Sequence, residues 1–124
     1  MTDVTRTRMA AATGFLAVAL GALGAHGLKD ILAHNETTAV WEKAVFYHCI
    51  HVVMLFVIAG RKPFAAGAWW SFLAGIVLFS GSLYFLAVTN IKWLGAITPL
   101  GGMAFLSGWW MLLVKAGKSG GNSS

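Results

Sequence analysis

The residues Gly95-Ala96-Ile97-Thr98-Pro99-Leu100-Gly101-Gly102 form the stretch on which the fold depends. Glycine and proline have the poorest helix propensities, yet this run lies inside an otherwise apolar segment. In water it would be interpreted as a loop, whereas inside a bilayer its backbone polar groups must be satisfied by neighbouring protein. The stretch therefore predicts a membrane segment that packs tightly against another helix.

The composition of the chain also indicates a membrane protein. The 124 residues are 58% hydrophobic and 10% charged, whereas about 25% of the residues in an average soluble domain are charged. The net charge is +5, but the basic residues occur singly or in pairs between apolar runs, so nucleic-acid binding is not expected. The single cysteine, Cys49, excludes an internal disulfide and is expected in the core.

Four apolar segments approach or exceed the roughly 20 residues that a membrane helix needs. They are 9–27, 44–60, 64–89 and 93–114. The sequence therefore predicts an all-α fold, a four-helix transmembrane bundle in a single domain at 9–114. A cytoplasmic N-terminus at 1–8 and a flexible C-terminal tail at 115–124 flank it. The polar segment 28–43 is predicted to be a short amphipathic, extracytoplasmic connection, with Asn35 as the N-cap of the helix that follows.

The first apolar segment also has the outline of a cleavable signal peptide, since Arg6 and Arg8 precede it. Small residues recur at Ala17, Gly21 and Ala25, a spacing that lets membrane helices approach closely. A discarded signal needs no packing face, so we expect a retained membrane helix.

Basic and aromatic residues predict the orientation. Six basic residues would lie on one side and three on the other: Arg6, Arg8, Arg61, Lys62, Lys115 and Lys118 against Lys29, Lys43 and Lys92. The positive-inside rule then places both termini in the cytoplasm. Tryptophans are expected as belts near the two interfaces: Trp69, Trp70, Trp109 and Trp110 inside, Trp41 and Trp93 outside.

Polar side chains gather in the outer half of the predicted membrane segments. The binding candidates are His26, His51, Ser82, Tyr84 and Thr98. Ionisable residues inside a membrane mark ligand or proton sites, so a shared polar pocket is one interpretation. The other is that these groups hydrogen-bond one another and hold the helices in register, at about 0.6 kcal/mol per bond.

His48 and His51 lie on neighbouring positions of one helix face and could bind a metal only with a third ligand. His26 or Glu42 would have to supply it. We therefore expect no metal site, no cofactor and no catalytic residue.

Pro99 leaves two interpretations open. If the fourth helix starts at Trp93, Pro99 removes the hydrogen bond to the Gly95 carbonyl and kinks the helix. Alternatively, Thr98 caps a helix whose first residue is Pro99, and the preceding residues form a separate interfacial turn. The kinked continuous helix is favoured.

Four blocks of the sequence resemble a known family. They are 21–28, Tyr47 with His51, 79–84 and 93–102. In this order they resemble the small membrane proteins of domain of unknown function 423, which include bacterial inner-membrane proteins and the eukaryotic transmembrane protein 256. The resemblance implies four membrane helices in a bacterial plasma (inner) membrane and no known activity. His48 lies outside the family's pattern.

The sequence thus predicts a non-enzymatic, multi-pass membrane protein with a structural or interaction role. Its expected partners are the lipid bilayer and either a second copy of the chain or another membrane protein. The alternative is a ligand-binding protein or a small-molecule or ion pathway built on the outer polar cluster. That alternative requires His26, His51, Tyr84 and Thr98 to face one water-accessible cavity.

Overall fold

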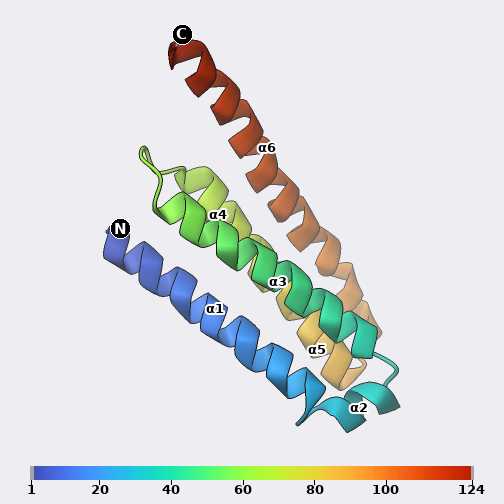
Figure 1. Ribbon diagram of the computed structural model, residues 1–124. Helices are drawn as coiled ribbons and strands as arrows, with labels where there is room; N and C mark the ends of the chain where they lie inside the picture. Colours follow the sequence, from blue (N-terminus) through green and yellow to red (C-terminus); the bar gives the residue numbers. More distant parts are fainter. Residues whose placement is uncertain (1, 124) are drawn as a thin grey trace.

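The computed structural model describes residues 2–123, which are almost entirely helical (Figure 1). The elements in order are α1 (Asp3–Ala25), α2 (Lys29–His34), α3 (Thr38–Ala59), α4 (Ala66–Gly75), the π-helix η1 (Ile76–Ser80), α5 (Gly81–Thr89), the 3-10 helix η2 (Lys92–Ala96) and α6 (Thr98–Ser123). Four helical stretches are long and apolar enough to cross a membrane: Asp3–Ala25, Thr38–Ala59, Ala66–Thr89 and Lys92–Ala116. The predicted four-helix transmembrane fold is confirmed.

α3 is the central helix of the bundle. α1 packs along one side of α3, the continuous helix α4–η1–α5 packs along another, and α6 packs on α4 and η1. The two termini lie at one end and α2 at the other (Figure 1). Within residues 2–123, α1 packs on α3 and α2 and makes no extensive contact with α4, α5 or α6. One edge of α1 therefore faces one edge of α5 with no helix between them.

Small residues let neighbouring helices approach closely. Ala17 of α1 is buried, and a Cβ added at Gly24 would overlap the indole of Trp41. In α6, a Cβ added at Gly101 would overlap the backbone of Phe79. Ala17, Gly24 and Gly101 are thus used for close packing inside the bundle.

Two of the six tryptophans form part of the protein interior. Trp69 is 0% exposed and donates its indole N–H to the Leu55 carbonyl. Trp41 is also buried and donates to the Leu20 carbonyl. Each indole N–H thus finds a carbonyl acceptor on a neighbouring helix, and the interfacial belts stay a prediction.

The predicted cap at Asn35 is wrong. Asn35 is the C-cap of α2, Glu36 has a left-handed backbone with φ 57°, and α3 begins only at Thr38. The Asn35 amide donates instead to the carbonyls of Ala87 and Val88, both at 3.0 Å. Local propensity cannot reveal acceptors that lie more than fifty residues away along the chain.

The kink predicted at Pro99 is also wrong. The 3-10 helix η2 precedes an α-helix that begins at Thr98, so Pro99 lies in the first turn of α6. A first-turn residue has no carbonyl partner four residues earlier in its helix, so proline costs nothing there. The alternative interpretation, a helix that starts here after a separate turn, is right in outline, but Thr98 is the first residue of α6 rather than its cap, and its hydroxyl bonds Ser82. α6 then continues to Ser123, through the residues expected to form a flexible tail.

Candidate intramembrane binding groove

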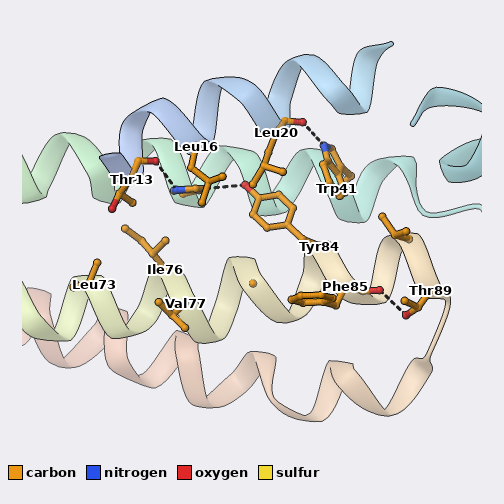
Figure 2. Close-up of a pocket in the computed structure, with 13 residues that line it drawn as sticks. Thr13, Leu16, Leu20, Trp41, Leu73, Ile76, Val77, Tyr84, Phe85 and Thr89 are labelled. Carbon is orange, nitrogen blue, oxygen red and sulfur yellow. Dashed lines mark hydrogen bonds between the residues drawn. The ribbon is translucent and has the colours of Figure 1, made fainter. Parts of the chain in front are cut away.

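A groove of about 620 Å³ runs between α1 and the helix α4–η1–α5, with α3 as its floor (Figure 2). Its α1 wall consists of Thr13, Leu16 and Leu20, and its floor of Trp41 and His48. The opposite wall consists of Leu73, Ile76, Val77, Gly81, Tyr84, Phe85, Val88 and Thr89. The groove exists because α1 and α5 each pack on α3 but do not pack on each other.

The π-helix η1 shapes the wall opposite α1. π-Helical turns hold more residues than α-helical turns, so they change which side chains face a neighbour, and they occur frequently at functional sites. Ser80, the last residue of η1, is buried and donates its hydroxyl to the Ala44 carbonyl of α3 at 2.7 Å. The next residue, Gly81, lines the groove, and a Cβ added there would meet nothing within 4 Å. The wall is therefore open at Gly81.

His48 links three helices at the floor of the groove. It is 1% exposed, with Nε2 at 3.0 Å from the Thr13 carbonyl and Nδ1 at 2.8 Å from the Tyr84 hydroxyl. A carbonyl oxygen can only accept, so Nε2 carries the proton and Nδ1 accepts from the Tyr84 hydroxyl. The order of donation is thus Tyr84 to His48 to the Thr13 backbone, from α5 through α3 to α1. Dashed lines in Figure 2 mark the bonds that end on Tyr84 and Thr13.

The other side-chain donors that line the groove are also used within the protein. The Trp41 indole N–H donates to the Leu20 carbonyl at 2.8 Å. The Thr13 hydroxyl donates to the Met9 carbonyl at 2.8 Å, and the Thr89 hydroxyl donates to the Phe85 carbonyl at 2.6 Å. Among its lining side chains the groove therefore offers oxygen lone pairs as acceptors and no uncommitted N–H or O–H donor.

Of the candidates proposed from sequence, Tyr84 lines the groove and His51 lies elsewhere. His51 donates from Nδ1 to the Tyr47 carbonyl at 2.8 Å and accepts at Nε2 from the Trp109 indole at 3.1 Å. Its ring stacks on Phe105 with a centroid distance of 3.7 Å. His51 thus fixes α3 to α6, whereas Tyr84 bonds His48.

The remaining candidates occupy two further places. Ser82 and Thr98 share a 2.7 Å hydrogen bond that joins α5 to the start of α6. His26 is exposed at the end of α1. The expected shared pocket is wrong, because the candidates lie at different helix interfaces. A small-molecule or ion pathway required these side chains to face one water-accessible cavity, and they do not.

The geometry also gives no support to a two-histidine metal site. Both ring nitrogens of His48 and of His51 are engaged in hydrogen bonds. In the described part of the chain no three His, Cys, Asp or Glu side chains are placed to hold a metal ion. Cys49 is exposed on α3, so its expected place in the core is wrong.

Sequence reasoning missed three parts of the groove: His48, the Thr13 carbonyl and Gly81. One signal could have indicated His48, since it follows Trp41 by seven residues and so lies on the same face of a helix two turns later. Nothing local indicates the Thr13 carbonyl, because a backbone acceptor carries no sequence signature. The openness at Gly81 depends on η1, which was not predicted.

Comparison with known proteins gives one family match and several bacterial relatives. Residues 20–102 match the family described as "Protein of unknown function (DUF423)". The chain is 48% identical over 116 residues to the UPF0382 membrane protein YwdK of Bacillus subtilis, covering 89% of this chain and 94% of that protein. It is 42% identical over 117 residues to a UPF0382 membrane protein of Staphylococcus epidermidis, covering 91% and 95%. No solved structure matches the chain.

Proposed function

Because the chain belongs to the DUF423 family, whose bacterial relatives are named membrane proteins, we propose that it is a non-catalytic interaction protein of the bacterial inner membrane. It acts by binding a partner laterally, within the bilayer. The observation that carries this proposal is the apolar groove between α1 and α5, which the described helices leave unfilled.

The chemistry of the groove supports binding rather than catalysis. A catalytic site needs a nucleophile, acid or base that can exchange protons with a substrate. At this floor the His48 N–H is held by a backbone carbonyl, and the Tyr84 proton is held by His48. These groups fix three helices relative to one another and leave no free base facing the groove.

The rim of the groove is accessible from the hydrocarbon. Val77 and Phe85, on the wall opposite α1, are 64% and 67% exposed, and Leu16 on α1 is 51% exposed. An apolar partner can thus enter sideways from the bilayer without crossing water. A membrane helix, from a second copy or another protein, and a lipid-like molecule both meet this condition.

The groove is tested by photo-crosslinking at two lipid-facing positions in native membranes. A benzophenone amino acid replaces Val77 in the groove or Leu106 on the outer face of α6, which is 70% exposed. Position 77 is expected to capture one predominant species, because a shaped groove selects its occupant, and position 106 the bulk lipid mixture. Identical adduct distributions at both positions would refute the proposal.

The proposed orientation places both termini in the cytoplasm. Two basic residues lie at the end of the bundle where α4 begins: Arg6 stacks over Phe64, and Lys115 borders Ala65 and Gly67. Basic residues favour the cytoplasmic side of a membrane, which supports this orientation. In a Cys49→Ser background, Glu36→Cys is expected to react with a membrane-impermeant thiol reagent in intact cells. Lys62→Cys is expected to react only after permeabilisation, and the reverse pattern would overturn the orientation.

A further inference from the structure

We propose that the groove binds an apolar alcohol, a long-chain amphiphile whose hydroxyl donates a hydrogen bond to the Tyr84 oxygen. This inference rests on the proposed function, because it names the chemical class of the partner that occupies the same groove. It follows from the hydrogen-bond chain at the floor and from the shape and lining of the walls.

The hydrogen-bond chain fixes the polarity that a ligand must have. The Thr13 carbonyl takes the N–H of His48, so the other ring nitrogen takes the hydroxyl proton of Tyr84. Tyr84 lines the groove, and its oxygen, after donating to His48, keeps lone pairs that can accept a hydrogen bond. A ligand hydroxyl can donate to it, whereas an ester or quinone carbonyl meets another acceptor and stays unpaired.

The position of Tyr84 is itself fixed by its neighbours. Its ring packs against Trp41 with a centroid distance of 4.7 Å and an interplanar angle of 58°. The Trp41 indole is in turn held by the Leu20 carbonyl. A pre-positioned acceptor loses little conformational freedom on binding, which favours recognition of a single hydroxyl.

The walls suit a single hydrocarbon chain. From Tyr84 towards the N-terminal end of α4, the lining extends eleven residues to Leu73, or about 17 Å at 1.5 Å per residue. Leu16, Ile76 and Val77 cover this stretch with aliphatic side chains. The volume of about 620 Å³ lies within the roughly 300–1,000 Å³ of small-molecule sites.

The same lining disfavours a membrane helix as the occupant. Helices associate in membranes through small residues that let their backbones approach. Gly81 is the one glycine or alanine among the lining residues, and Leu20, Trp41 and Phe85 project large side chains. A helix would touch these tips, whereas a thin chain can lie between them.

The test measures binding of three matched probes to the full-length protein in lipid nanodiscs. The probes are 1-hexadecanol, hexadecyl methyl ether and methyl hexadecanoate, which share an apolar chain and differ in the hydroxyl donor. Native mass spectrometry gives the bound fraction at each concentration. The alcohol is expected to bind about 3- to 16-fold more tightly than either analogue, the range that hydrogen bonds between membrane helices supply.

Three variants separate the hydroxyl contact from the groove itself. Tyr84→Phe removes the acceptor and should abolish the preference for the alcohol while the ether still binds. Gly81→Leu fills the groove where a Cβ meets no atom, and it should bind none of the probes. Ala22→Leu introduces the same side chain at an exposed α1 position that does not line the groove, and this variant should bind like the unmodified protein.

The outcomes distinguish a failure of the alcohol proposal from a failure of the proposed function. If the unmodified protein binds the alcohol and the ether equally, the proposal of an alcohol ligand is overturned, and the proposal that the groove binds a partner still stands. A crosslink from position 77 to a protein also overturns the alcohol ligand, because it identifies a membrane helix as the occupant of the groove. Unchanged binding of all probes to Gly81→Leu overturns both proposals. If Tyr84→Phe fails to fold, the probe comparison on the unmodified protein still decides.

Discussion

The adjacent glycines Gly101 and Gly102 are expected to respond in opposite ways to alanine. A Cβ at Gly101 would overlap the backbone nitrogen of Phe79 and lie 2.7 Å from its Cα, whereas ordinary contacts begin at 3.4 Å. α6 must therefore move away from η1 by at least about 0.7 Å (3.4 minus 2.7). A Cβ at Gly102 would lie 4.0 Å from the Phe79 ring, an ordinary contact.

The two substitutions gain the same helix propensity, but only one of them overpacks the interface between α6 and η1. Replacing glycine by alanine inside a helix gains about 1 kcal/mol at either position. Overpacking costs about 1–3 kcal/mol, and it applies to Gly101 alone. Gly102→Ala is expected to be about 1 kcal/mol more stable than the unmodified chain, with Gly101→Ala about 1–3 kcal/mol below Gly102→Ala.

Equilibrium unfolding in mixed micelles, followed by far-ultraviolet circular dichroism, measures this difference. The adjacent variant is the control, because both changes lie in the same turn of α6 and add the same methyl group. If Gly101→Ala is as stable as Gly102→Ala, the close approach of α6 to η1 is wrong.

Two further predictions use the same unfolding measurement. Gly24→Ala should lower the free energy of unfolding by about 1–2 kcal/mol, because the new Cβ displaces the Trp41 indole; Gly21→Ala, whose Cβ would lie 3.5 Å from its nearest neighbour, should not. Ser82→Ala removes the hydroxyl that donates to the Phe79 carbonyl and bonds Thr98. At about 0.6 kcal/mol for each bond the expected loss of stability is about 1.2 kcal/mol, and a loss above about 3 kcal/mol would contradict this prediction.

The membrane segments could be predicted from sequence because their signal is local. Length and hydrophobicity decide whether a helix can span a bilayer. The segment predicted at 64–89, for example, agrees closely with the observed helical stretch Ala66–Thr89. The start of α6 was left open between two interpretations for a physical reason. Proline is compatible with both a kink and a first turn, so the residue alone does not decide between them.

The candidate site was harder to predict because its partners are distant in sequence. His48 and His51 are three residues apart, yet one bonds Tyr84 and the other Trp109. Depth in the membrane suggested which residues lie at one level, but not which helix each one faces. The face depends on the order of helices around α3 and on the register change at η1.

The most direct test is native mass spectrometry of the protein released from native membrane vesicles, with Gly81→Leu as the comparison. The unmodified chain is expected to retain a bound small molecule of defined mass that chemical derivatisation identifies as an alcohol. Gly81→Leu is expected to fold and to lack it, because the new side chain occupies the space beside Tyr84 that is open in the unmodified protein. The same bound species on both proteins, at the same occupancy, would contradict binding in the groove.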